Sequence, residues 1–490
     1  MPSRRLSVVL LVALAVALIL SAAACAARGS RNPGLNSQLA PQLVLVSPPR
    51  GQISALSALS LTVHTELPIA GGGLFLASGT SGNVKQVAAL GVSMKTLDAN
   101  TIAKVYYFVE KSAGAEAPLR AMGAVVYEDD RQLLLALPAR SEADFLAEAV
   151  TLSPHIQLVT NDAVALPAVR AASMLAAPDA ADPAIARLLE RVTADRLRDA
   201  LADLSGERSV LVAGKPVTLS TRYSFSPRIG DAIQYVTEAF TRLGLSAQTV
   251  GWSYGKYSGK NIVVDVRGDV HPERIWIVGA HLDDRSPTPY TNAPGADDNA
   301  SGMSALLALA EVVAQQRLRD SVRFVAFTGE EQGMWGSKSY ARSLQASGVK
   351  VMGFINLDML AYDGNDDRVV ELHSGSRPGS VDLAAAFASA NRRYGAGLVI
   401  ETRRDTASRF SDHSAFWDAG YDAILVIENF YDDGARTADR NPWYHKTGDT
   451  VAVARLNYVE RLARVALATI LELAGPLHGA LPTSTPTVTP

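Results

Sequence analysis

The chain has 490 residues, of which 48% are hydrophobic and 19% charged, and its formal net charge is −3. This length allows two or more domains, and the hydrophobic content is typical of globular rather than disordered protein. The small charge gives no electrostatic case for binding nucleic acid or an anionic membrane surface. With one cysteine, Cys25, the chain cannot form an intrachain disulfide, and a metal site in its globular part cannot use thiolate ligands.

Residues 1–25 have the pattern of an export signal. Arg4 and Arg5 precede an uncharged apolar run over 6–24 that closes in small residues. Cys25 follows directly, so the segment resembles a bacterial lipoprotein signal, in which the cysteine is lipidated, although Ala22 stands where such signals usually carry leucine. A plain cleaved signal and an uncleaved membrane anchor are the alternatives. Each of these predicts a protein that works outside the cytoplasm, with possible membrane attachment through Cys25.

Two segments precede the main domain. Residues 26–44 are polar, without a hydrophobic period, and are expected to form a linker. Residues 45–170 are expected to form a smaller accessory α+β domain, with strands at 73–78, 105–110, 124–129, 132–138 and 155–159 and a capped helix at 142–150. This region has no cluster of His, Asp and Glu, which favours a structural module. A role in restricting or inhibiting substrate access is the alternative.

Residues 178–478 alternate strands with helices. Helices are predicted at 185–204, 224–243, 302–316, 336–347 and 455–473, and strands at 261–266, 275–280, 322–328, 351–357 and 424–427. This alternation predicts an α/β fold with a mixed, largely parallel sheet and helices on both faces. The Thr/Pro-rich tail, 479–490, is expected to be disordered.

Three successive strands of this domain end in side chains that are costly to bury. They are His281 and Asp283, then Glu330 and Glu331, then Asp358. Asp297 and Asp298 lie in the loop after the first of these strands. Because ligand sites form where the carboxyl ends of parallel strands meet, we expect these groups to converge. Imidazole nitrogen and carboxylate oxygen suit zinc or a similar divalent ion, and so many carboxylates are better explained by two ions sharing a bridging carboxylate than by one.

Six motifs, in order, resemble the M28 family of di-zinc peptidases, whose best known members are secreted bacterial aminopeptidases. They are GAHLDD, APGADDNASG, FTGEEQGMWGS, INLDM, SDHSAFWDAGY and WYHKTGDT. The resemblance covers about residues 180–477. It implies the zinc-peptidase fold, two Zn²⁺ ions as cofactors and peptides as substrates.

The resemblance also implies roles for single residues. The five metal ligands would be His281 and Asp358 on one ion, Glu331 and His445 on the other, and Asp298 bridging both. Asp298 is chosen over Asp297 because it stands four residues before Gly302. Glu330 matches the general base, and Asp283 the carboxylate that orients the first histidine ring. Tyr444 stands where some family members carry a tyrosine that stabilises the oxyanion.

Most of the other histidines and aspartates considered are interpreted as surface, structural, loop or capping residues. Four histidines outside the motifs are interpreted as surface residues: His64, His155, His271 and His478. His373 is expected to be structural, and Asp284 and Asp297 to be loop or capping residues. A hydrogen-bonding or substrate-side role is left open for Asp412 and His413.

The expected function is an extracytoplasmic metallo-aminopeptidase with a glutamate general base. The alternatives are a carboxypeptidase or other amide hydrolase on the same metal centre, and a catalytically silent binding or receptor-like protein. The complete set of ligands and base favours hydrolysis over the silent alternative, and five ligands disfavour a one-zinc cyclase of the same family.

Overall fold

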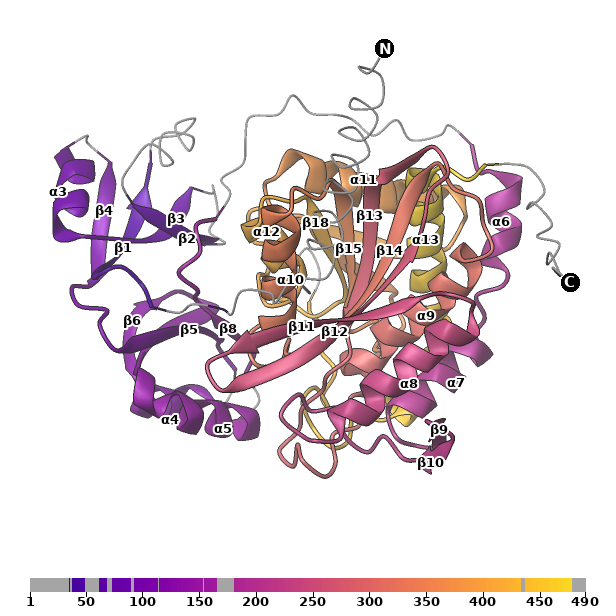
Figure 1. Cartoon of the computed structure of the whole chain (residues 1–490), viewed down its shortest axis with the longest axis horizontal. Helices are drawn as coiled ribbons and strands as arrows, with labels where there is room; N and C mark the ends of the chain where they lie inside the picture. Colours follow the sequence, from indigo (N-terminus) through magenta and orange to yellow (C-terminus); the bar gives the residue numbers. More distant parts are fainter. Residues whose placement is uncertain are drawn as a thin grey trace, which may run out of the picture.

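The computed structural model describes residues 35, 38–48, 61–67, 73–89, 92–112, 114–152, 154–164, 180–432 and 437–477 (Figure 1). The expected export signal with Cys25, most of the expected linker, His478 and the Thr/Pro-rich tail lie outside these residues. In the described part of the chain, none of the helices combines the length and apolarity that crossing a membrane requires.

The N-terminal region contains two antiparallel four-stranded sheets. The first, in the order β2-β3-β1-β4, is formed by β1 (Gln42–Ser47), β2 (Thr62–Leu67), β3 (Leu74–Gly79) and β4 (Ser93–Asp98), with helix α3 (Ser81–Ala89). The second, in the order β6-β7-β5-β8, is formed by β5 (Lys104–Glu110), β6 (Ala124–Glu128), β7 (Gln132–Pro138) and β8 (Ile156–Leu158), with helices α4 (Glu116–Met122) and α5 (Glu142–Leu152).

The sequence predicted only part of this region. Strands β3, β5, β6, β7 and β8 and helix α5 lie where strands and a helix were expected. Strand β1 begins at Gln42, inside the stretch expected to be linker, and α3 and β4 were not predicted. The reason is that α3 buries only Val87 among its described side chains and β4 buries none fully, so neither shows a clear apolar period.

The C-terminal region is built on an eight-stranded sheet with the order β11-β12-β14-β13-β15-β18-β16-β17. Its strands are β11 (Ala247–Tyr254), β12 (Tyr257–Val266), β13 (His271–His281), β14 (Asp320–Phe327), β15 (Val351–Leu357), β16 (Val369–His373), β17 (Val399–Arg403) and β18 (Ala423–Glu428). The four central strands, β14-β13-β15-β18, are parallel, whereas β12 and β16 join them antiparallel on either side. A short hairpin, β9 (Val210–Val212) and β10 (Lys215–Val217), lies outside this sheet. The mixed, largely parallel sheet that was predicted is confirmed.

Helices cover both faces of this sheet. They are α6 (Pro183–Leu189), α7 (Ala194–Leu204), α8 (Ile229–Arg242), α9 (Gly302–Val313), α10 (Trp335–Ala346), α11 (Pro378–Arg393), α12 (His413–Asp418) and α13 (Leu456–Ala474). Along β13, Trp276 and Val278 pack into the core that contains α9 and α13, whereas Ile277 packs into the core that contains α10 and α12. This alternation follows from the two-residue period of a strand.

One segment that was predicted to form a continuous helix is interrupted. The segment 185–204 forms two helices, α6 and α7, rather than one. Thr193 precedes α7 in an extended conformation and its side chain accepts a hydrogen bond from Arg196 N, which is the N-cap arrangement that starts a new helix. The apolar spacing continues through the break because both helices face the same core.

The two regions share an apolar core. Phe145 and Leu158 of the N-terminal region pack in one cluster with Tyr254 and Trp335 of the C-terminal region. Figure 1 shows the β11–β12 hairpin lying beside β8 and α5. At this contact Glu142 Oε1 accepts hydrogen bonds from the hydroxyls of Tyr107, at 2.8 Å, and Tyr254, at 2.7 Å.

Candidate metal centre

The five predicted ligands and the predicted base converge at the carboxyl edge of the central parallel strands. His281 is the last residue of β13, Glu330 and Glu331 follow β14, and Asp358 follows β15. Asp298 and His445 arrive from the loops that precede α9 and α13. Each of these side chains is at most 3% exposed, although they come from five separate segments.

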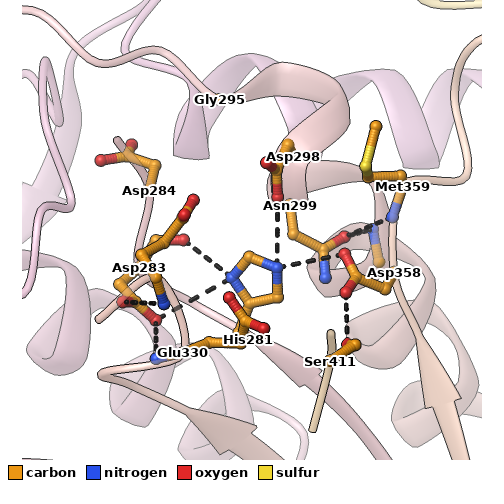
Figure 2. Close-up of polar contacts among 12 residues, drawn as sticks. His281, Asp283, Asp284, Gly295, Asp298, Asn299, Glu330, Asp358, Met359 and Ser411 are labelled. Carbon is orange, nitrogen blue, oxygen red and sulfur yellow. Dashed lines mark hydrogen bonds and ion pairs between the residues drawn. The ribbon is translucent and has the colours of Figure 1, made fainter. Parts of the chain in front are cut away.

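Asp298 lies between the two histidines. Its Oδ1 is 3.2 Å from His281 Nε2, and its Oδ2 is 3.0 Å from His445 Nε2. His281 Nε2 is also 3.1 Å from Asp358 Oδ1, and His445 Nε2 is 3.1 Å from Glu331 Oε2. The ligand atoms therefore form two histidine–carboxylate pairs joined by one shared carboxylate. Figure 2 shows the half with His281, Asp298 and Asp358.

These residues fit divalent zinc. One ligand atom each of His281, Asp298 and Glu331 lie within 4.8 Å of one another. Neither carboxylate oxygen of Glu331 has a hydrogen-bond partner among the described residues. Burial lowers the pKa of His445, but the Glu331 and Asp298 carboxylates outweigh it and raise that pKa to about 9. A buried set of imidazoles and carboxylates with surplus negative charge is a donor set that suits zinc.

Arg222 holds the loop that carries Asp298. Its guanidinium is fully buried and donates to the main-chain carbonyls of Leu282 at 2.8 Å, Pro294 at 2.9 Å and Gly295 at 3.0 Å, so it ties the two ends of the loop together. It also pairs with Asp284 at 3.1 Å. Burial raises the pKa of Asp284 to about 7 although Arg222 lowers it. Asp284 is therefore a structural partner of Arg222.

Gly295 is required where the chain turns toward Asp298. Its φ is +45°, in the left-handed region, and a Cβ there would lie 2.3 Å from the main-chain oxygen of Asp298 and 2.9 Å from an Arg222 nitrogen. A side chain at this position would push the Asp298 loop away from Arg222.

Asn299 ties the Asp298 loop to the end of β15. Its Nδ2 donates to Leu357 O at 2.9 Å, and its Oδ1 accepts from Met359 N at 3.3 Å (Figure 2). These two residues flank Asp358, so the carriers of two ligands are joined directly. The peptide bond between Asp298 and Asn299 is cis.

Asp283 contacts the site differently from what was expected. His281 Nδ1 is 3.0 Å from the main-chain carbonyl of Asp283 and 3.9 Å from its carboxylate, so the carbonyl is the nearer group that orients the ring. The carboxylate instead accepts hydrogen bonds from Ser224 Oγ at 2.9 Å and from the main-chain N–H groups of Glu330 at 3.3 Å and Glu331 at 3.4 Å. Asp283 thus fixes the turn that presents both glutamates.

Ser411 and Asp412 lie beside this centre. Ser411 donates to Asp358 Oδ2 and accepts from Asn356 Nδ2 at 2.7 Å, so it positions that ligand. Asp412 is fully buried, and burial raises its pKa to about 7. His413 bonds the main-chain oxygen of Ser408 at 2.9 Å, on the structural side of the motif.

Asp297 faces away from the ligands, as a loop residue should. Its carboxylate accepts from Ala361 N at 2.7 Å and Asn441 Nδ2 at 2.9 Å. His373 is buried against Glu371 at 2.8 Å, in the structural position expected for it.

Tyr444 lies against His445 but bonds a residue of the N-terminal region. Its ring stacks on the His445 ring with centroids 3.7 Å apart, and its hydroxyl is 2.7 Å from His155 Nδ1. The interpretation of His155 and His64 as surface residues is wrong, since each is only 5% exposed. Neither belongs to a motif, and only the packing of the folded chain reveals that they are buried.

This chain is similar to known proteins in family, in sequence and in structure. The family model described as "Peptidase family M28" matches residues 261–470. A "Probable zinc metalloprotease" of Pyrenophora tritici-repentis is 26% identical over 332 residues, which cover 57% of this chain and 76% of that protein. A protein of the same description from Leptosphaeria maculans is 30% identical over 247 residues, which cover 44% of this chain and 57% of that protein.

Among solved structures, the LapA aminopeptidase of Legionella pneumophila is similar with a TM-score of 0.55 and 18% identity, covering 76% of this chain and 98% of that one. LapB from the same organism has the same TM-score and identity and covers 76% of this chain and 99% of that one. At this identity the likeness concerns the fold. A coverage of 76% is more than residues 178–478 could supply, so the shared fold extends into the N-terminal region.

Proposed function

We propose that this chain, whose residues 261–470 match the peptidase family M28, is an extracytoplasmic zinc-dependent aminopeptidase that uses two zinc ions. The observation that carries the two-ion proposal is the position of Asp298. Its two oxygens lie 3.2 Å and 3.0 Å from nitrogens of two different histidines, each of which has a second carboxylate of its own. One carboxylate shared by two such pairs supports a bridged pair of ions.

In this proposal His281 and Asp358 would hold one zinc ion, Glu331 and His445 would hold the other, and Asp298 would serve both. The bound ions supply Lewis acidity, which polarises the scissile carbonyl and makes an attacking water more acidic. Glu330 takes a proton from that water and passes it to the departing amine. Its Oε2 has no hydrogen-bond partner among the described residues, so it is available for this transfer.

Two neighbouring residues, Asp283 and Tyr444, support this reaction. Asp283 accepts hydrogen bonds from the Glu330 and Glu331 main-chain N–H groups, which fixes how both carboxylates point into the site. Tyr444, stacked on His445, presents its hydroxyl beside the reacting carbonyl and stabilises the oxyanion that forms there.

The proposal for location rests on the export-signal pattern of residues 1–25. We expect Cys25 to carry a lipid that attaches the protein to a membrane. Replacing Cys25 with serine should move the protein from the membrane fraction to the soluble fraction and abolish labelling by a radioactive fatty acid. Labelling that persists in this variant would contradict lipidation at Cys25.

The reaction is tested with matched substrates. The zinc-loaded protein should hydrolyse aminoacyl p-nitroanilides with a free amine and should not hydrolyse the same compounds when the amine is blocked. Metal analysis should give two zinc ions per chain. Cleavage of N-blocked peptides at their carboxyl end would instead show a carboxypeptidase or other amide hydrolase, and no cleavage of either substrate by zinc-loaded protein would show a silent binding protein.

A further inference from the structure

We propose that the N-terminal region completes the active site by supplying His155, a positioning residue that fixes the hydroxyl of Tyr444. The inference rests on the proposed function, in which this hydroxyl stabilises the oxyanion. It gives the N-terminal region a part in the reaction beyond that of a structural module.

The ring of His155 packs against side chains of the C-terminal region. Its ring is stacked on Phe410, with centroids 6.0 Å apart and planes 7° apart, and lies edge-on to His445 with centroids 5.3 Å apart. Its Nδ1 is 2.7 Å from Tyr444 Oη. The stacking of Tyr444 on His445 fixes the plane of the phenol ring, and the contact with His155 fixes the direction of its O–H bond.

The second neighbour of Nδ1 indicates which group donates. Glu110 Oε2 lies 3.4 Å from the same nitrogen of His155, and Glu110 is only 7% exposed. A carboxylate and a phenol oxygen can both accept from an Nδ1–H group. With the proton on Nδ1, His155 donates to Tyr444 Oη, and the hydrogen of Tyr444 remains available for the oxyanion.

The main chain beside His155 is held from both regions. Arg285, which is 3% exposed, donates to Pro154 O at 2.9 Å and also bonds Ala149 O. The main-chain oxygen of His155 accepts from Glu110 N at 2.8 Å. Arg285 Nε lies 3.8 Å from Glu331 Oε2, so the residue that anchors this segment also borders the metal centre. The imidazole is therefore placed before a substrate binds, which is what a positioning residue requires.

The test uses His155→Phe, which keeps an aromatic ring but has no donor, and His155→Asn, whose amide can donate from the position of Nδ1. On whichever substrate the wild type hydrolyses, His155→Phe should lower kcat about 10- to 100-fold. This loss should not exceed the loss of kcat that follows when an oxyanion donor is removed altogether. KM should change less than about twofold and zinc content should stay at the wild-type value, since no ligand is removed. His155→Asn should recover most of the lost kcat. Thr151→Ala, at an exposed position of α5, is the control and should match the wild type.

A double-mutant cycle tests whether His155 affects kcat through Tyr444. If His155 acts through Tyr444, adding His155→Phe to Tyr444→Phe should cause no further loss of kcat. An unchanged kcat in His155→Phe, or the same fold loss in both backgrounds, would overturn the inference. If Tyr444→Phe is as active as the wild type, the oxyanion role of Tyr444 fails together with the inference. If Tyr444→Phe loses activity and His155→Phe does not, only the inference fails.

A second variant covers the case in which His155→Phe does not fold. Glu110→Gln removes the carboxylate that favours a proton on Nδ1 while it keeps the size of the side chain. It should lower kcat in the same direction, about several-fold, and should have no effect in the Tyr444→Phe background. Equal losses in both backgrounds would overturn the inference.

Discussion

Glu330 and Glu331 are neighbours in the chain, yet their carboxylates have different surroundings. Glu331 Oε2 forms an ion pair with His445 Nε2 at 3.1 Å, whereas no ion pair joins Glu330 to a histidine among the described residues. Glu330→Gln should therefore lower kcat by about 10²- to 10⁴-fold, because the amide cannot take a proton. Its zinc content should equal that of the wild type. Loss of zinc from this variant would make Glu330 a ligand instead of the base.

Asp298 differs from the other carboxylates because it faces both histidines. Asp298→Ala should lower zinc at both positions. Asp358→Ala removes a carboxylate that pairs with His281 and should lower zinc at one position. The measurement is zinc per chain after dialysis against a weak chelator. Two zinc ions retained in Asp298→Ala would remove Asp298 as the bridge.

The candidate ligands could be predicted from the sequence because each follows a buried strand or lies in its own motif. The atoms through which residues act could not be predicted. The spacing placed Asp283 near His281 but did not show that its carbonyl, rather than its carboxylate, is the nearer group. Arg222 and His155 carry no sequence signal, since each is a single polar residue whose partners lie far away in the chain.

At the scale of elements, Arg222 helps to hold the loop of the strand–loop–helix unit from β13 to α9, which brings His281 and Asp298 together. Arg222→Met leaves Asp284 buried without its ion pair and frees four main-chain carbonyls, those of Leu204, Leu282, Pro294 and Gly295. We expect the free energy of unfolding to fall by about 3–5 kcal/mol and zinc affinity to fall with it. Urea titration and zinc competition measure the two effects.

Arg228→Met is the matched control, because Arg228 is exposed and its side chain donates to a surface carbonyl, Thr218 O. Adding Asp284→Asn to Arg222→Met should recover part of the lost stability, since the unpaired charge is removed. A stability in Arg222→Met equal to that of Arg228→Met would show that the loop holds its shape without this guanidinium.

Elements with a continuous apolar run were predicted well, and those without one were missed. Strand β15 has the predicted bounds, 351–357, because its last five residues are all buried. Strand β11 was not predicted because buried and exposed residues follow one another along it without a two-residue period. It is the edge strand of the large sheet and reaches the N-terminal region, so part of its burial comes from a contact that local sequence does not encode.

At the scale of the whole molecule, the shared core predicts that the two regions unfold as one unit. Tyr254 donates across the contact to the Glu142 carboxylate oxygen that also accepts from Tyr107, and Phe145 packs with Trp335 in the same cluster. All five tryptophans lie in the C-terminal region and three of them lie outside the shared cluster, so tryptophan fluorescence mainly reports the unfolding of that region. A perturbation placed in the N-terminal region therefore tests whether the two unfold together.

His64 in β2 provides such a perturbation. Its Nε2 is 2.7 Å from Ser78 Oγ, and burial lowers its pKa from 6.5 to about 4. Above pH 6.5 the imidazole is neutral in both the folded and unfolded chain, so the stability is full. As the pH falls from 6.5 to 4 only the unfolded chain takes up this proton, and the free energy of unfolding should fall by about 3 kcal/mol.

The measurement is the difference in unfolding free energy between the wild type and His64→Gln, followed by tryptophan fluorescence from pH 7.5 to pH 4. Because both proteins lose zinc alike on acidification, that loss cancels in the difference. The wild type should lose about 3 kcal/mol relative to His64→Gln across this range if the regions unfold as one unit. A constant difference by fluorescence, with a pH-dependent one by far-ultraviolet circular dichroism, would show that the N-terminal region unfolds separately and leaves the metal domain folded.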